Sequence, residues 1–120
     1  MILIADSGSS KTDWAYFDKL TNQFKIIRTI GLNPYYIDSK RITDELNSSF
    51  DLLKISKSVR KVFFYGAGCS DDSKKNIIFD SLNSFFLNSN IHIEHDLLGA
   101  CYSVNSKKTS INCILGTGSI

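Results

Sequence analysis

Apolar and polar residues follow two different periods along the chain, and the change of period predicts the order of the elements. The first 30 residues contain three short runs rich in β-branched and aromatic residues, which predict strands at residues 1–5, 13–17 and 24–30. Short turns separate these strands. We therefore expect the three strands to pair as an antiparallel meander.

A helical period begins after residue 34. Apolar residues recur every three or four positions, which predicts a helix that faces the core, and Asp38 or Ser39 can cap its start. The expected core stripe of this helix consists of Ile42, Leu46, Phe50 and Leu53.

Strands and helices then alternate to the end of the chain. Further strands are expected at residues 61–65, 91–94 and 110–115, and a further helix at residues 96–104. Ser70 can cap the helix between the first two of these strands. The inner stripe of that helix is expected to hold Ile78, Leu82, Phe85 and Phe86.

Three meander strands followed by alternating strands and helices predict an α/β fold, with a mixed five-stranded sheet and flanking helices. The last strand runs into a glycine-rich turn of a kind that normally leads into further structure. We therefore expect residues 1–109 to form one lobe, and residues 110–120 to be the first strand and turn of a second, truncated lobe.

Composition narrows the classes of function. An apolar content of 42% can build a core, and 14 basic against 12 acidic residues leave a net charge of +2 without a basic cluster, so we expect no nucleic-acid partner. No apolar run approaches the roughly 20 residues that span a bilayer, so no membrane contact is expected and the cytoplasm is the default location.

Cysteine and histidine residues do not predict a metal site. Cys69, Cys101 and Cys113 lack C-x-x-C spacing, so we expect reduced and mostly buried thiols. His92 and His95 would face opposite sides of a strand, which is poor geometry for a shared metal.

The turn between the first two strands is the first candidate for chemistry. Small residues there let backbone N–H groups approach an anion, and serine hydroxyls add hydrogen-bond donors for phosphate oxygens. The carboxylate of Asp6, at the end of the first strand, suits Mg²⁺ bound through water. The same composition also fits an ordinary hairpin turn. The turn consists of Gly8, Ser9, Ser10, Lys11 and Thr12.

Two other segments add to this signal. A second glycine-rich turn follows an apolar strand and can hold phosphate from the opposite side. Asp96, expected at a strand's end, can orient a hydroxyl and accept its proton, although a helix N-cap explains the position as well. The residues of the second turn are Gly116, Thr117, Gly118 and Ser119.

Four of these segments occur in the order found in one known family. Asp6 to Thr12 resembles the phosphate-1 motif D-x-G-G-T-K of sugar kinases, with Ser9 and Ser10 in place of Gly and Thr, and Gly116 to Ser119 resembles the second phosphate motif. With Gly31-Leu32-Asn33 and His95-Asp96 between them, the chain resembles the N-acetylglucosamine kinase branch, which is grouped with BadF/BadG-type ATPases.

This resemblance implies an actin-like, RNase H-like lobe that binds ATP and Mg²⁺ in a cleft against a second lobe. Both glycine-rich turns would contact the nucleotide phosphates, and Asp96 would be the catalytic base for the 6-hydroxyl of an amino sugar. Asn33 would contact the sugar, although it also fits a turn before Pro34. The other segment that the resemblance places against the sugar comprises Gly66, Ala67 and Gly68.

The resemblance leaves other functions open. Related ATPases activate a 2-hydroxyacyl-CoA dehydratase through an iron–sulfur cluster, which needs cluster cysteines that the spacing here does not suggest. A non-catalytic sugar-sensing regulator is a third possibility, and the full-length protein can form a homodimer. Trp14, Tyr35 and Tyr36 can stack on a sugar, although packing in the core is the expected role of Trp14.

Overall fold

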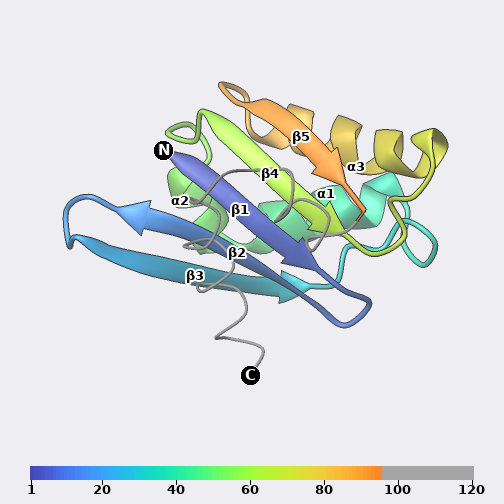
Figure 1. The fold of residues 1–120 in the computed structure, drawn as a ribbon, viewed down its shortest axis with the longest axis horizontal. Coiled ribbons are helices and arrows are strands. Elements are labelled where there is room, and N and C mark those ends of the chain that lie inside the picture. Colours follow the sequence, from blue (N-terminus) through green and yellow to red (C-terminus); the bar gives the residue numbers. More distant parts are fainter. Residues whose placement is uncertain (96–120) are drawn as a thin grey trace.

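A mixed β-sheet organises the molecule, as Figure 1 shows for the computed structural model, which describes residues 1–95. The strand order is β3-β2-β1-β4-β5; β1, β2 and β3 pair antiparallel, whereas β4 lies parallel to both β1 and β5. The predicted meander and mixed five-stranded sheet are confirmed. The strands are β1 (Ile2–Ser7), β2 (Lys11–Asp18), β3 (Gln23–Ile30), β4 (Lys61–Gly66) and β5 (Asn90–Glu94).

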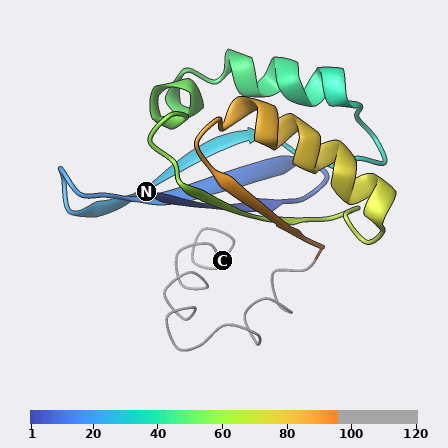
Figure 2. The same cartoon turned by 90° about the horizontal axis from the view of Figure 1, so that it is seen from above.

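Three helices cover one face of this sheet (Figure 2). They are α1 (Ser39–Ser48), α2 (Phe50–Ile55) and α3 (Asp72–Phe85). The side chain of Asp38 accepts a hydrogen bond from the Arg41 backbone N–H at 2.9 Å, so the expected N-cap of the first helix is confirmed.

The expected helical stripe is wrong in its second half. The helix ends at Ser48, and Ser49 then caps a separate helix by accepting from the Leu52 backbone N–H. Because of this break, α2 has its own buried face, which consists of Leu52 and Ile55. Phe50 and Leu53, which were expected in the core, are 75% and 45% exposed.

The N-cap of α3 is also one residue later than expected. Asp71, rather than Ser70, accepts from the Lys74 backbone N–H at 2.9 Å, because an aspartate oxygen caps as well as a serine hydroxyl. Ile78 and Leu82 are fully buried as predicted. Phe86, just after the helix, is fully buried too, and Phe85 packs on the core while partly exposed.

The core lies between the sheet and the helices, with Trp14 near its centre. The Trp14 ring is fully buried, and its centroid lies 6.0 Å from those of both Phe64 and Phe86. Its indole N–H donates to the Thr29 hydroxyl at 3.0 Å, which satisfies its one polar group. The expected packing role of Trp14 is confirmed.

Some expectations concern residues outside the described range. The helix at 96–104, the strand at 110–115 and the lobe boundary near residue 109 belong to this group. Within residues 1–95, none of the helices combines the length and apolar character needed to cross a membrane.

The burial pattern makes a direct prediction for stability. Leu46→Ala should lower the free energy of unfolding by about 2–5 kcal/mol, because it leaves a cavity where a fully buried side chain packs. Leu20→Ala is the matched control: Leu20 is 97% exposed, and its loss should change stability by less than about 0.5 kcal/mol. Chemical unfolding of both variants measures the difference, and equal effects would contradict the placement of the core.

Candidate functional site

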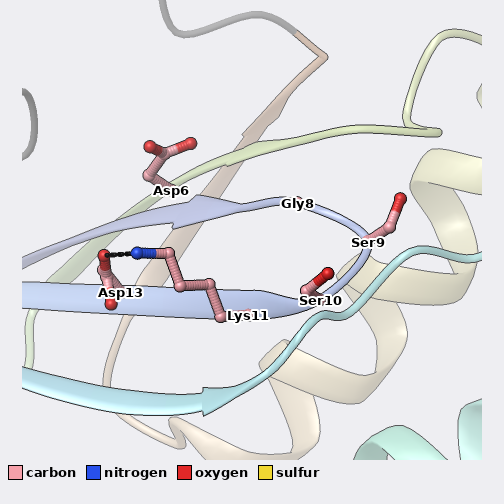
Figure 3. Close-up of a pocket in the computed structure, with 6 residues that line it drawn as sticks. All are labelled: Asp6, Gly8, Ser9, Ser10, Lys11 and Asp13. Carbon is pink, nitrogen blue, oxygen red and sulfur yellow. Dashed lines mark ion pairs between the residues drawn. The ribbon is translucent and has the colours of Figure 1, made fainter. Parts of the chain in front are cut away.

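A hollow of about 280 Å³ lies beside the turn between β1 and β2 (Figure 3). Six of the residues predicted to bind phosphate or metal lie within residues 1–95, and five of these six line the hollow, together with one aspartate that the sequence analysis did not select. The side chains of Ser9 and Ser10 are exposed at the tip of the turn. The lining residues are Asp6, Gly8, Ser9, Ser10, Lys11 and Asp13.

The turn is held closed by backbone pairing at its base. The Gly8 N–H donates to the Lys11 carbonyl at 2.9 Å, and Ser7 is the register partner of Thr12. These contacts fix the ends of the turn, while its tip keeps exposed polar groups that can face an anion.

Thr12 does not line this hollow, although the sequence analysis grouped it with the phosphate-binding residues. It is fully buried, and its hydroxyl donates to the Ile30 carbonyl at 2.9 Å. Because that donation uses its single hydroxyl proton, the 2.7 Å bond between Thr12 and Ser7 must have Ser7 as donor. Thr12 therefore supports the base of the turn from inside.

Ser7 belongs to the motif that resembles phosphate-1, but the sequence analysis did not select it as a site residue. It is 3% exposed, and its hydroxyl accepts from the Leu32 N–H at 2.9 Å while donating to Thr12. Its carbonyl accepts from the Ala67 N–H at 2.9 Å. One residue thus joins the first turn, the segment after β3 and the loop after β4.

A row of charges crosses the face of the sheet opposite the helices, at the hollow. Asp6 is the register partner of Asp13, and Asp13 is the register partner of Arg28, so the three side chains share one face. The Arg28 Nε–H donates to Asp13 Oδ1 at 2.8 Å, and the Lys11 ammonium lies 3.6 Å from Asp13 Oδ2. Figure 3 shows the Lys11 side chain extended along β2 toward Asp13.

The charge state of Asp6 is shifted by this environment. Burial raises the pKa of Asp6 above its ordinary value, the neighbouring Asp13 carboxylate raises it further, and Lys11 acts in the opposite direction. A cation bound beside Asp6 would stabilise its ionised form and so offset the effects of burial and of Asp13 on its pKa. A half-buried carboxylate on a polar hollow therefore fits the hard-oxygen chemistry of Mg²⁺.

The two segments expected to contact a sugar pack against each other. Gly68 has a φ of 83°, and a Cβ added there would lie 2.2 Å from Asn33 Oδ1. Asn33 is 7% exposed, and its Oδ1 accepts from the Tyr35 N–H at 3.0 Å, so its alternative role in a turn is present. Whether Asn33 also contacts a sugar stays a prediction.

Gly31 lets the turn between β1 and β2 lie directly against the segment that carries Asn33. A Cβ on Gly31 would lie 2.3 Å from the Gly8 carbonyl oxygen and 2.5 Å from Ser9 backbone atoms. Such contacts exclude any side chain at this position, so only glycine lets the two backbones approach. The hollow and the Asn33–Gly68 contact therefore lie at the same end of the sheet.

A comparison with solved structures finds a similar protein. The chain aligns with the crystal structure of a protein named as a candidate N-acetylglucosamine kinase from Porphyromonas gingivalis, with 35% sequence identity and a TM-score of 0.67. The alignment covers 78% of this chain and 34% of that protein. No protein-family model and no curated protein matches the sequence.

The predicted resemblance to the N-acetylglucosamine kinase and BadF/BadG-type ATPase family is confirmed. The mixed sheet with its helices is the lobe fold of this kinase-like family. The described residues include the first of the two turns predicted to bind phosphate. Five predicted site residues lie outside the described range, namely Asp96, Gly116, Thr117, Gly118 and Ser119.

Tyr35 and Tyr36 follow Asn33 closely in the sequence and are 55% and 76% exposed. The Tyr35 hydroxyl donates to Asp71 at 3.4 Å, and the Lys74 ammonium lies 4.6 Å from the centre of the Tyr35 ring. These contacts fasten the segment after β3 to the start of α3. Tyr36 remains available for stacking at the surface.

Cys69 is buried beside Gly66, at the end of β4. Burial raises the pKa of its thiol to about 11, so it stays protonated at neutral pH. The expected buried, reduced thiol is confirmed for Cys69, whereas Cys101 and Cys113 lie outside the described residues. His92 is exposed and stacks on Phe63 with ring centroids 5.0 Å apart.

The raised pKa of Asp6 predicts the effect of removing its charge. Above pH 3.8, the ordinary value, folded Asp6 binds more protons than unfolded Asp6, so stability falls as the pH rises through this window. Asp6→Asn should therefore raise the melting temperature of the nucleotide-free protein at pH 7. That gain should shrink as the pH is lowered toward 3.8.

Asp18→Asn is the matched control, with the opposite sign. The Leu20 backbone N–H and Lys25 lower the pKa of Asp18, so its carboxylate is favoured in the folded state and its loss should be slightly destabilising at pH 7. Melting curves across the pH range compare the two variants. A lower melting temperature for Asp6→Asn than for the wild type at pH 7 would contradict the account.

Proposed function

We propose that this chain is the nucleotide- and sugar-binding lobe of an ATP-dependent sugar kinase. Its substrate would be an amino sugar, with N-acetylglucosamine, phosphorylated on its 6-hydroxyl, as the first candidate. The observation that carries this proposal is the close approach of Gly31 to Gly8 and Ser9. It puts a turn suited to phosphate beside the contact between Asn33 and Gly68, as a transfer from nucleotide to sugar requires.

The phosphate tail of ATP would lie on the turn after β1. Backbone N–H groups at Ser9 and Ser10 and the two exposed serine hydroxyls offer donors, and the Lys11 ammonium adds a positive charge at the edge of the hollow. In the full-length protein, Gly116 to Ser119 would close on the tail from a second lobe.

Asp6 would hold Mg²⁺ through a coordinated water molecule. When bound, the ion supplies charge neutralisation to the phosphate tail. The chain's own contribution is a half-buried carboxylate near the end of β1 that lines the hollow and whose ionised form a cation would favour.

Asp96 would orient the sugar hydroxyl and accept its proton. A carboxylate in this role needs to face the acceptor oxygen within hydrogen-bond reach, and it needs no unusual pKa to assist a phosphoryl transfer that proceeds by positioning and charge. The residue follows β5 by two positions in the sequence. The carboxyl ends of β1, β4 and β5, where ligands of α/β sheets bind, share this edge.

The setting we propose is the cytoplasm, with no nucleic acid and no membrane as partner, and a homodimer is one possible assembly of the full-length protein. The chain spans 34% of the similar kinase-type protein, so the rest of the catalytic cleft would come from further sequence. A dehydratase activator is less favoured, because residues 1–95 hold a single cysteine, Cys69, and that cysteine is buried.

A coupled assay of ADP release tests the proposed activity. The full-length protein should release ADP from ATP in the presence of Mg²⁺ and N-acetylglucosamine, and at lower rates with other amino sugars. A brown, iron-containing protein without sugar-dependent ADP release would favour the dehydratase activator. Sugar binding without any turnover would favour a sugar-sensing regulator.

Asp96→Asn tests the proposed base. This change should lower kcat by at least about 100-fold, the usual contribution of a general base, because the amide cannot accept the proton. Calorimetry should show that N-acetylglucosamine still binds. Retained turnover would remove Asp96 from the mechanism, and Asp80→Asn on the exposed side of α3 serves as the matched control.

A further inference from the structure

Ser7 occupies a central place among the segments of the proposed site. It precedes the phosphate-type turn, yet the turn's hollow is lined by other residues. Its hydroxyl and carbonyl instead contact backbone groups of the two segments that carry Asn33 and Gly68. Its position is therefore suited to holding other residues rather than to touching a ligand.

The hydrogen bonds of Ser7 leave it little freedom. Leu32 N–H donates to its hydroxyl at 2.9 Å, and the hydroxyl proton goes to Thr12 at 2.7 Å. The hydroxyl is thus a donor and an acceptor at once, in a buried setting where an unsatisfied backbone N–H costs about 1–3 kcal/mol. The position of Leu32 N–H is therefore tied to that of Ser7.

The two segments joined by this hydrogen bond lead directly to the two proposed subsites. On one side, Ser7 is bonded in sequence to Gly8, which begins the phosphate-type turn. On the other, Leu32 is bonded to Asn33, whose carboxamide packs on Gly68. The Gly31 backbone fills the remaining gap against Gly8 and Ser9. A shift of the turn must therefore move the Asn33 segment as well, since packed backbones cannot pass through one another.

We propose that Ser7 is a positioning residue that couples the phosphate subsite to the sugar subsite. Through the bond from Leu32 N–H to Ser7 Oγ, ordering of the turn by a nucleotide favours the arrangement of Asn33 that receives the sugar. The coupling is reciprocal, so sugar binding strengthens nucleotide binding by the same factor. This inference rests on the proposed kinase function and adds a residue that holds its two subsites together.

The experiment measures, in the full-length protein, the factor by which nucleotide binding strengthens sugar binding. The dissociation constant of N-acetylglucosamine is determined by calorimetry without nucleotide and with saturating Mg·ADP, which binds without turnover. In the wild type, Mg·ADP should tighten sugar binding by about fivefold or more, the lower end of usual coupling. In Ser7→Ala, the ratio of the two dissociation constants should fall close to one.

Ser81→Ala is the matched control. Ser81 is 4% exposed, and its hydroxyl donates to the Ile77 carbonyl at 3.0 Å within α3, so the substitution removes a similarly buried hydroxyl away from both subsites. This variant should keep the wild-type ratio. A general loss of stability would instead lower the melting temperature of both variants and leave the ratio of each unchanged.

A second variant covers the case in which Ser7→Ala does not fold. Ser7→Cys keeps a side chain of similar shape with a weak donor and acceptor, so it should fold and show a ratio between those of the wild type and unity.

A wild-type ratio in a folded Ser7→Ala or Ser7→Cys variant would overturn the coupling role, as would a wild-type protein that binds both ligands independently. A different result would contradict the proposed kinase function itself: a wild-type protein that binds neither Mg·ADP nor N-acetylglucosamine.

Discussion

The hydroxyl group of Ser7 is the point on which the organisation of the site depends. The sheet alone would bring the ends of β1 and β4 together, but it does not determine where the chain goes after β3. The bonds from Leu32 N–H to Ser7, from Ser7 to Thr12 and from Thr12 to Ile30 fix that direction. Because Gly31 has no side chain, the segment can then pack directly against the backbone of the turn. The turn between β1 and β2 and the segment after β3 are thereby brought into contact.

The charges on the face of the sheet opposite the helices follow from the register of the strands. Asp6, Asp13 and Arg28 stand in one row across three strands, and Lys11 reaches the same carboxylate from the turn. Two acids and two bases balance in formal charge, yet Arg28 and Lys11 both engage Asp13. Asp6 is left as the carboxylate whose ionisation is opposed by burial. A site for a hydrated cation is best placed beside such a group.

The sequence was sufficient to predict the sheet and most of the hollow, because both depend on local patterns. Alternating apolar runs predicted the strands, and a small-residue turn after a buried strand predicted that Gly8, Ser9, Ser10 and Lys11 would line one hollow with Asp6. The resemblance to a sugar-kinase family, drawn from short motifs, is supported by a structure with 35% identity.

The errors have physical causes that no local pattern reveals. Ser49 interrupts a continuous helical period because its hydroxyl caps a new helix, which exposes Phe50 and Leu53. Asp13 was missed because its pairing with Asp6 depends on register across the turn, and Ser7 because its partners lie 5 and 25 residues away. The most direct test of the central claim is a crystal structure of the full-length protein with Mg²⁺, a non-hydrolysable ATP analogue and N-acetylglucosamine. The account predicts the terminal phosphates on the turn of Gly8 to Lys11 and the sugar against Asn33 and Gly68; phosphates bound elsewhere, with this hollow empty, would contradict it.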